Sequence, residues 1–191
     1  MLRETLSAIK NGKYKKEETV HNLKLKDADI RNSKVYLPKD IDGLKRLNGS
    51  HCNNGRIETF CENADSFTVA RKIVEKSNDK VLVLNLANPV HPGGGVRNGA
   101  RAQEEDLCRK STLLVSQEDK SAQQYYKYNN SLHTYMGSDA IVITPKVEIL
   151  RDENGDWLED SVVVSVMTCA APMITYGLES MNQTEYEEMV Y

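Results

Sequence analysis

Hydrophobic residues recur at helical intervals in three parts of the chain. Leu2, Leu6 and Ile9 lie on one face of a first predicted helix, and Asn11-Gly12 ends it, as asparagine and glycine often do. The same spacing predicts a second helix that Asp65 caps and that runs through residue 76, and a third over residues 103–117. Each of these helices is expected to bury one face.

Aliphatic runs without helical spacing predict the strands. The run VLVLNLA at residues 81–87 is almost continuously apolar, which is typical of a strand buried on both faces in the middle of an α/β sheet. Further strands are predicted over residues 140–144, 146–150 and 161–168, with a turn at 152–156. Short strands and loops are predicted for residues 20–60. The alternation of helices with buried strands favours a three-layer α/β/α domain.

The last residues predict a helix that is cut short. Asn182 and Glu185 have the spacing of a capping box, and apolar residues follow at helical intervals. The sequence ends at Tyr191, about two turns into that helix, and so short a helix is marginal in isolation. Either the helix packs well, or the chain is shorter than its fold requires.

Composition and charge narrow the class of protein. The 191 residues fit one domain. A net charge of −3 argues against a general nucleic-acid or membrane-surface binder. No apolar run approaches the roughly 18 residues of a membrane span, and residues 1–10 carry charges where a signal peptide would be apolar. The four cysteines are widely spaced and predict free thiols, so a cytoplasmic location is expected.

Three glycines follow the apolar run at 81–87. Gly93, Gly94 and Gly95 have no Cβ atoms and can take positive φ, so successive backbone N–H groups could converge on one anion. The alternative is a plain flexible turn, although Pro89 and Pro92 stiffen the approach. The spacing matches neither a dinucleotide-binding G-x-G-x-x-G nor a Walker A loop. A phosphate held by backbone alone is therefore predicted at the end of this strand.

Gln103, Glu104 and Glu105 open the third predicted helix. Acidic residues in a first turn often serve only to favour the helix dipole. Beside a phosphate loop, the pair has a second interpretation, since cleavage of a glycosidic bond needs a carboxyl group that protonates the leaving oxygen. The neighbouring carboxylate could hold a ribose hydroxyl and raise the pKa of its partner toward that of a usable general acid.

Other candidate sites have weaker patterns. His51, Cys52 and Cys61 do not have the spacing of a usual zinc site. Cys108 is interpreted as a buried small apolar residue rather than a nucleophile. Residues 125–128, with the sequence YYKY, combine aromatic and basic side chains as single-strand nucleic-acid platforms do, but without wider positive charge a packed helix face is preferred. No metal and no direct nucleic-acid contact are predicted.

Four segments together resemble one family. Residues 83–114 read VLNLANPVHPGGGVRNGARAQEEDLCRKSTLL, and this run resembles the glycine-triplet and Q-E-E signature of microbial-type poly(ADP-ribose) glycohydrolases. Residues 3–14, 136–152 and 163–172 also resemble that family, so the resemblance covers nearly the whole chain. It implies a macrodomain fold, in which a mixed sheet lies between helices and ADP-ribose binds in a cleft at the strand ends.

The resemblance also implies roles for individual residues. The residues expected to hold the diphosphate are Gly93, Gly94, Gly95 and Val96. Asn88 and Glu104 are expected to hold the ribose that carries the scissile bond. Glu105 is expected to protonate the leaving oxygen and then activate water, while Gln103 orients the pair. The family implies no metal or other cofactor.

The chain departs from the family after residue 172. The family continues with a long helix, another strand, a second glycine-rich phosphate loop and a closing helix, and that region also supplies an aromatic residue near the adenosine. We therefore expect one catalytic domain over residues 1–191, with an N-terminal helical and irregular extension over 1–64 and a core over 65–191 that is incomplete at its C-terminus. Apolar strands such as 81–86 and 162–168 would then lack neighbours, so the chain is expected to self-associate or to need the missing segment.

The expected function is hydrolysis of ADP-ribose O-glycosidic bonds, in poly(ADP-ribose) or on ADP-ribosylated proteins. One alternative is a module that binds ADP-ribose without cleaving it. A second alternative is an inactive fragment, or one half of a split enzyme.

Overall fold

The computed structural model describes residues 1–47, 58–77, 79–133 and 137–171. A mixed sheet of four strands in the order β3-β5-β6-β4 forms the centre of these residues. The strands are β3 (Lys34–Tyr36), β5 (Ile141–Arg151), β6 (Trp157–Ala170) and β4 (Leu82–Ala87). β3, β5 and β6 are antiparallel neighbours, whereas β4 runs parallel to β6. The predicted α/β class with a mixed sheet is confirmed.

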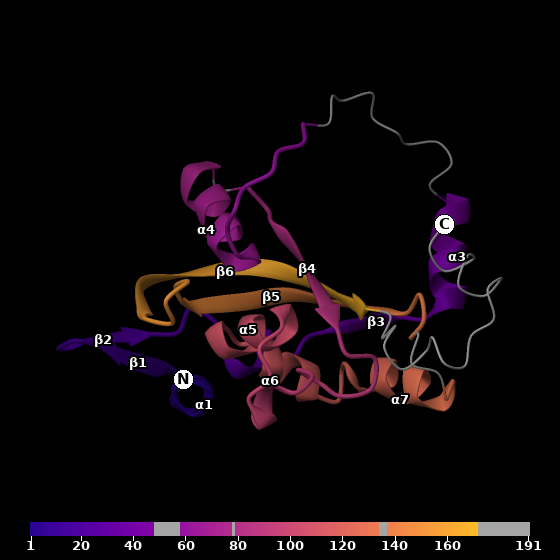
Figure 1. Ribbon diagram of the computed structural model, residues 1–191, viewed down its shortest axis with the longest axis horizontal. Helices are drawn as coiled ribbons and strands as arrows, with labels where there is room; N and C mark the ends of the chain where they lie inside the picture. The colour runs from indigo at the N-terminus through magenta and orange to yellow at the C-terminus, as the bar shows by residue number, and fades with distance from the viewer. Residues whose placement is uncertain (48–57, 78, 134–136, 172–191) are drawn as a thin grey trace.

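Helices lie on both sides of this sheet (Figure 1). One side carries α5 (Gln103–Lys110), α6 (Leu113–Glu118) and α7 (Gln123–Ser131). On the other side, α4 (Ser66–Ser77) lies at the end where β4 begins, and its first turn reaches α5, where Gln103 Nε2 donates to Ser66 Oγ at 3.4 Å. The remaining elements are α1 (Leu2–Asn11), β1 (Lys13–Lys16), β2 (Thr19–Asn22), α2 (Asp27–Ile30), α3 (Pro38–Leu47) and the short 3-10 helix η1 (Val96–Asn98).

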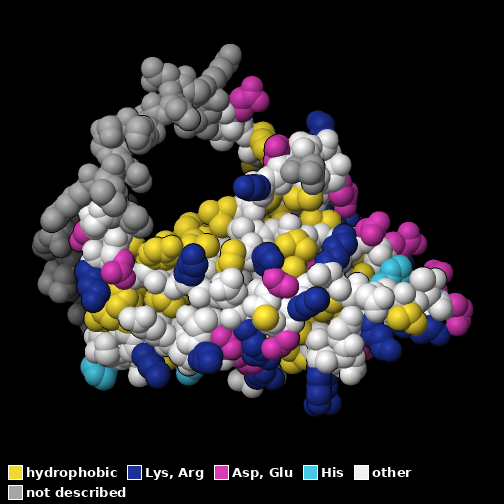
Figure 2. All heavy atoms as spheres, turned by 180° about the vertical axis from the view of Figure 1, so that it is seen from behind, with side chains coloured by type: hydrophobic (Ala, Val, Ile, Leu, Met, Phe, Trp, Pro, Cys, Tyr) yellow, Lys and Arg dark blue, Asp and Glu magenta, His cyan; other side chains and the backbone are white. Residues whose placement is uncertain are grey.

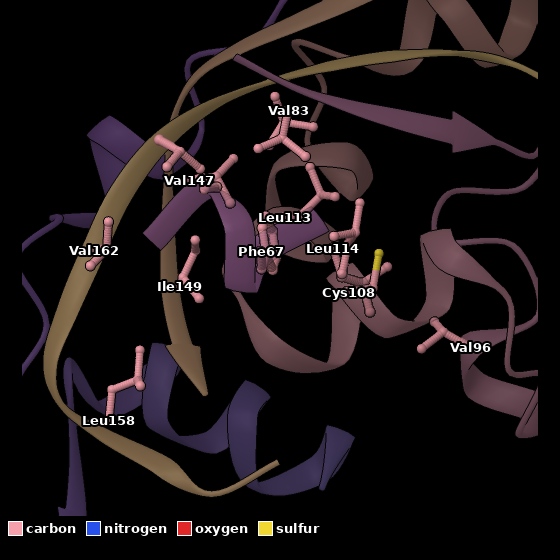
Figure 3. Packing of buried hydrophobic residues seen from close by; sticks show 14 residues of the cluster. Phe67, Val83, Val96, Cys108, Leu113, Leu114, Val147, Ile149, Leu158 and Val162 are labelled. Carbon is pink, nitrogen blue, oxygen red and sulfur yellow. The ribbon is translucent and has the colours of Figure 1, made fainter. Parts of the chain in front are cut away.

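The main core packs the sheet against α5 and α6, and Phe67 and Ala70 of α4 belong to the same cluster (Figure 3). Phe67 from α4, Leu113 from α6 and Val162 from β6 are among its buried residues. Leu2 and Leu6 of α1 pack against this core, and β3 pairs with β5 in the sheet. Elements from before residue 64 therefore contribute to the central sheet and its core.

Two predicted helix ends are confirmed by their capping geometry. α1 ends at Asn11, and Gly12 takes φ 67°, which is the left-handed conformation that a side chain would disfavour. At the start of α4, Asp65 accepts hydrogen bonds from the backbone N–H and the hydroxyl of Thr68, each at 2.9 Å. The predicted capping box at Asn182 and Glu185 lies outside the described residues.

The predicted burial of β4 on both faces is wrong. Burial alternates along the strand, and Leu82, Leu84 and Leu86 are 55%, 42% and 51% exposed. β4 is an edge strand of the described sheet, and α4 covers only the beginning of the face on which these leucines lie. The apolar run therefore reflects a strand with apolar side chains on both faces. The described residues cover only one of those faces.

The predicted helix over residues 103–117 is broken in two. Ser111 forms a bridge with Ile149, and the Thr112 N–H donates to Glu148 O at 3.1 Å, so these two residues join β5 instead of continuing the helix. The two strands predicted on either side of Pro145 are one strand, β5, whose register shifts between Thr144 and Val147. Proline has no N–H for a ladder bond and is accommodated at such irregularities.

Candidate active site

The candidate site lies at the carboxyl end of β4, where the chain turns through Asn88 into the glycine loop. Asn88 Oδ1 accepts hydrogen bonds from the N–H groups of Val90 and His91, at 2.9 and 2.8 Å, and so fixes this turn. The loop then returns to the start of α5, which carries Gln103, Glu104 and Glu105. The sequence-predicted residues are thus adjacent in space.

Glu104 is buried, with 3% of its surface exposed, and is held from three directions. Its Oε2 accepts the Asn88 N–H at 2.8 Å, and its Oε1 accepts hydrogen bonds from Gln117 Nε2 at 3.1 Å and from Asn85 Nδ2 at 3.4 Å. Burial raises the pKa of Glu104, these donors oppose that rise, and the charge of Glu105 adds to it. The net result is a carboxyl group with a raised pKa and a fixed orientation.

Glu105 is also buried, and both of its oxygens accept backbone N–H groups. Gly95 donates to Oε1 at 2.8 Å, and Ala102 donates to Oε2 at 2.9 Å. The first bond links the carboxyl group to the glycine loop and the second to the start of its own helix. Glu105 therefore cannot turn away from the loop without breaking two hydrogen bonds.

The backbone conformation and close neighbours of Gly94 require a glycine at this point of the loop. Its φ is +55°, and a Cβ atom added there would lie 2.4 Å from Glu105 Oε1 and 3.0 Å from Glu104 Oε2. At Gly93, φ is +68° and an added Cβ would meet Leu114 Cδ1 at 2.5 Å. Gly94 thus lets the loop backbone pack directly against both carboxyl groups, and Gly93 lets it pack against Leu114.

Most loop amides already have partners within the protein. The N–H groups of Gly94 and Val96 donate to His91 O at 2.9 Å and to Gly93 O at 3.1 Å, and that of Gly95 donates to Glu105. Backbone binding of a diphosphate by Gly93, Gly94, Gly95 and Val96 therefore stays a prediction, and it would require some of these amides to change partners.

Gln103 binds the edge of β4 rather than the two carboxyl groups. Its Oε1 accepts the Leu86 N–H at 2.9 Å, and its Nε2 donates to Leu84 O at 2.6 Å. The side-chain amide thus takes the place of a neighbouring strand at this edge. Its predicted role in orienting the glutamates would act through the backbone of α5.

A family profile matches most of the amino-acid sequence. The profile described as the catalytic domain of microbial-type poly(ADP-ribose) glycohydrolase matches residues 2–152. The chain belongs to this family. No curated protein sequence was found to match the chain.

Solved glycohydrolases have the same fold. The poly(ADP-ribose) glycohydrolase from Thermomonospora curvata is 26% identical with a TM-score of 0.89, and the match covers 99% of this chain and 69% of that chain. Its complex with the inhibitor ADP-HPD is 27% identical with a TM-score of 0.83, and the match covers 99% and 68%. The enzyme from Deinococcus radiodurans in complex with ADP-ribose is 33% identical with a TM-score of 0.71, covering 86% and 64%.

Sequence reasoning missed two residues that hold Glu104 in this glycohydrolase fold. Asn85 lies within the apolar run, is fully buried and also donates to Thr168 Oγ1 at 3.2 Å. Gln117 comes from α6, is fully buried, and accepts a bond from Cys108 Sγ at 3.4 Å. A polar residue in an otherwise apolar strand was a signal for Asn85, whereas nothing in the spacing of Gln117 connects it to the site.

A layer of tyrosines lies near Glu104. Tyr125 and Tyr126 of α7 are buried and meet edge to face, with their ring centroids 4.9 Å apart. Burial raises the pKa of Tyr126, and the charge of Glu104 raises it further. This pair is the packed helix face that the sequence predicted.

The described part of the chain holds no candidate metal cluster and no membrane-spanning helix. There, no group of three or more His, Cys, Asp or Glu side chains is arranged to hold a metal ion. His51 and Cys52 lie outside the described residues, and Cys61 is exposed. None of the described helices is long and apolar enough to cross a bilayer.

Proposed function

We propose that this chain hydrolyses the O-glycosidic bonds of ADP-ribose, in poly(ADP-ribose) or on ADP-ribosylated proteins, with Glu105 as the general acid. The observation that carries the proposal is the pair of buried carboxyl groups held against a glycine loop at the carboxyl end of β4. Family membership supports it, as do the related glycohydrolases in complex with ADP-ribose and ADP-HPD.

The two glutamates divide the chemistry. Glu104 accepts a hydrogen bond from a hydroxyl of the ribose whose bond is cleaved. Glu105 donates its proton to the leaving oxygen as the C–O bond breaks, which leaves an oxocarbenium-like ribose. A water molecule then adds to that carbon, and its proton passes to the Glu105 carboxylate, which restores the acid.

The backbone bonds to Glu105 support this role. Gly95 and Ala102 hold the carboxyl group in one position, and proximity of a fixed acid to the leaving oxygen lowers the barrier more than a mobile acid would. Each oxygen retains a second lone pair on which a proton can reside. The mechanism uses no metal, so addition of a chelator should leave the rate of hydrolysis unchanged.

The alternative is a module that binds ADP-ribose without cleaving it. Such a module needs the glycine loop and one ribose contact, whereas this chain buries a second carboxyl group beside the first. Incubation with poly(ADP-ribose) and, separately, with an ADP-ribosylated protein tests the difference. Release of free ADP-ribose supports the proposal, and binding without any release supports the alternative.

The face of the sheet that carries Leu84 and Leu86, which the described residues cover only in part, supports a proposal about partners. Leu84 of β4, Met167 of β6 and Ile143 of β5 form one row across the sheet, and Leu86, Cys169 and Ile141 form the next. Figure 2 shows hydrophobic side chains gathered between α3 and α4 on this side. We propose that this face packs against a second copy of the chain, or against a segment that corresponds to the part of the relatives outside the match. We also propose that the protein is cytoplasmic.

A further inference from the structure

A cavity of about 780 Å³ lies on the outer side of the segment that joins the glycine loop to α5. Its lining includes Gly99, Arg101 and Ala102 from that segment, Arg109 from α5, and Ala64 and Asp65 from the start of α4. This volume is within the range of small-molecule sites. None of these residues belongs to the set assigned above to the scissile ribose.

The cavity shares a wall with the catalytic carboxyl group. Ala102 lines the cavity, and its N–H donates to Glu105 Oε2 at 2.9 Å. The Arg109 guanidinium donates to the carbonyl of Ala100, whose own N–H donates to Gly95 O at 3.1 Å. A ligand in the cavity would therefore lie one backbone segment away from Glu105.

The charges around the cavity leave two arginines available. Asp65 and Asp106 also line it, but both contact the buried Lys110, whose Nζ lies 3.5 and 2.8 Å from their Oδ2 atoms. Among the described residues, neither Arg101 nor Arg109 forms an ion pair. By contrast, Arg97 on the same segment pairs with Glu118 at 2.6 Å. The single Lys110 balances only one of these two aspartates, so together with the two arginines the charged side chains at this cavity leave one net positive charge.

Two guanidinium groups around one cavity favour phosphate. Each presents a planar set of donors that matches two phosphate oxygens at once. In a poly(ADP-ribose) chain, a diphosphate recurs in every unit, so the unit joined to the one being cleaved carries its own diphosphate close to the scissile bond.

We infer that this cavity binds the diphosphate of the ADP-ribose unit adjacent to the cleaved bond, through Arg101 and Arg109. The inference rests on the proposed function. It narrows the substrate to the polymer, because the additional phosphate contact would make poly(ADP-ribose) bind more tightly than a single ADP-ribose. An acidic acceptor peptide is the competing occupant.

The test compares ligands of different length in the Glu105→Gln protein, which should bind without cleaving. Its Kd is measured by calorimetry for ADP-ribose, for a short poly(ADP-ribose) oligomer and for a mono-ADP-ribosylated acidic peptide. The same measurements are made after adding Arg101→Ala and Arg109→Ala together. Arg31→Ala with Lys34→Ala is the control, because it removes the same charge on residues that do not line the cavity.

The double arginine variant should bind the oligomer about tenfold or more weakly, the change expected from losing charge-assisted phosphate contacts. The affinity of Arg101→Ala for ADP-ribose, and that of the control for either ligand, should change less than about twofold on the same scale. Arg101→Ala alone removes no hydrogen bond among the described residues, so it gives a smaller loss without risk to folding.

Three results would overturn the inference. The oligomer affinity could be unchanged, the monomer and oligomer could weaken equally, or only the acidic peptide could weaken. Failure of the parent Glu105→Gln protein to bind ADP-ribose at all would be a separate result, because it contradicts the proposed function and removes this inference with it.

Discussion

The Gly95 N–H donates a 2.8 Å hydrogen bond to Glu105 Oε1, so the glycine loop and the proposed general acid form one unit. Burial of Glu105 behind this bond keeps water from competing for the carboxyl oxygen. In the proposed mechanism, the loop therefore positions the acid even before any phosphate binds.

Gly94→Ala should reduce the rate of hydrolysis by at least about tenfold. An ideally placed Cβ atom at this position would lie 2.4 Å from Glu105 Oε1, so the Glu105 carboxyl group would have to move. Gly12→Ala is a matched control, since Gly12 also has positive φ, at +67°, and an added Cβ there meets nothing within 4 Å. Both variants should lose about 1–2 kcal/mol of stability from the left-handed conformation. Steady-state kinetics and thermal unfolding of the two proteins check this, and equal activities would contradict the role of Gly94.

Gln117→Leu should weaken the support of Glu104. The buried carboxylate would lose a donor at 3.1 Å, and the loss is expected to cost about 1–3 kcal/mol of unfolding free energy at neutral pH. Because that donor opposes the rise in the pKa of Glu104, its removal should raise the pKa further. A titration of Glu104 by NMR that is the same in both proteins would contradict the assignment.

The stability of the protein should depend on the ionisation of Glu104. Its folded-state pKa lies above the ordinary value, so the folded state binds the proton more tightly than the unfolded chain does. This stabilisation is complete below the unfolded pKa and is lost as pH rises through the folded pKa. Chemical unfolding across that window should show wild type losing stability relative to Glu104→Gln as pH increases. A constant difference would mean that burial does not shift this group.

Leu84→Lys should reduce association of the chain without reducing its stability. Leu84 is 42% exposed on the partly covered face of the sheet, so a charge there would oppose packing against a partner but would remove little buried surface. Val20→Lys is the control, because Val20 is 57% exposed on β2. Light scattering over a range of concentrations measures the change. Unchanged association of Leu84→Lys would indicate that this face is not the interface.

The sequence could predict the parts of the site that depend on local pattern. The glycine triplet at a strand end and the adjacent glutamates on a helix start are specific in spacing, and the structure brings them together. Gln117 could not be predicted, because its contact with Glu104 depends on how α6 packs after the chain breaks at Ser111 and Thr112. That break in turn results from hydrogen bonds to β5, which no local propensity encodes. The exposure of Leu82, Leu84 and Leu86 was missed for a similar reason, since an apolar side chain does not reveal what covers it.

The central claim is that Glu105 transfers the proton while Glu104 holds the ribose, and Glu105→Gln tests it most directly. Glutamine at this position keeps the shape of the side chain and can still accept the Gly95 or Ala102 N–H through its one carbonyl oxygen. The release of ADP-ribose from poly(ADP-ribose) should fall by at least about 100-fold, while calorimetry shows ADP-ribose binding within a few-fold of wild type. Glu104→Ala, measured beside it, should lose affinity as well as rate. Release of ADP-ribose by Glu105→Gln at a near-normal rate would contradict the claim.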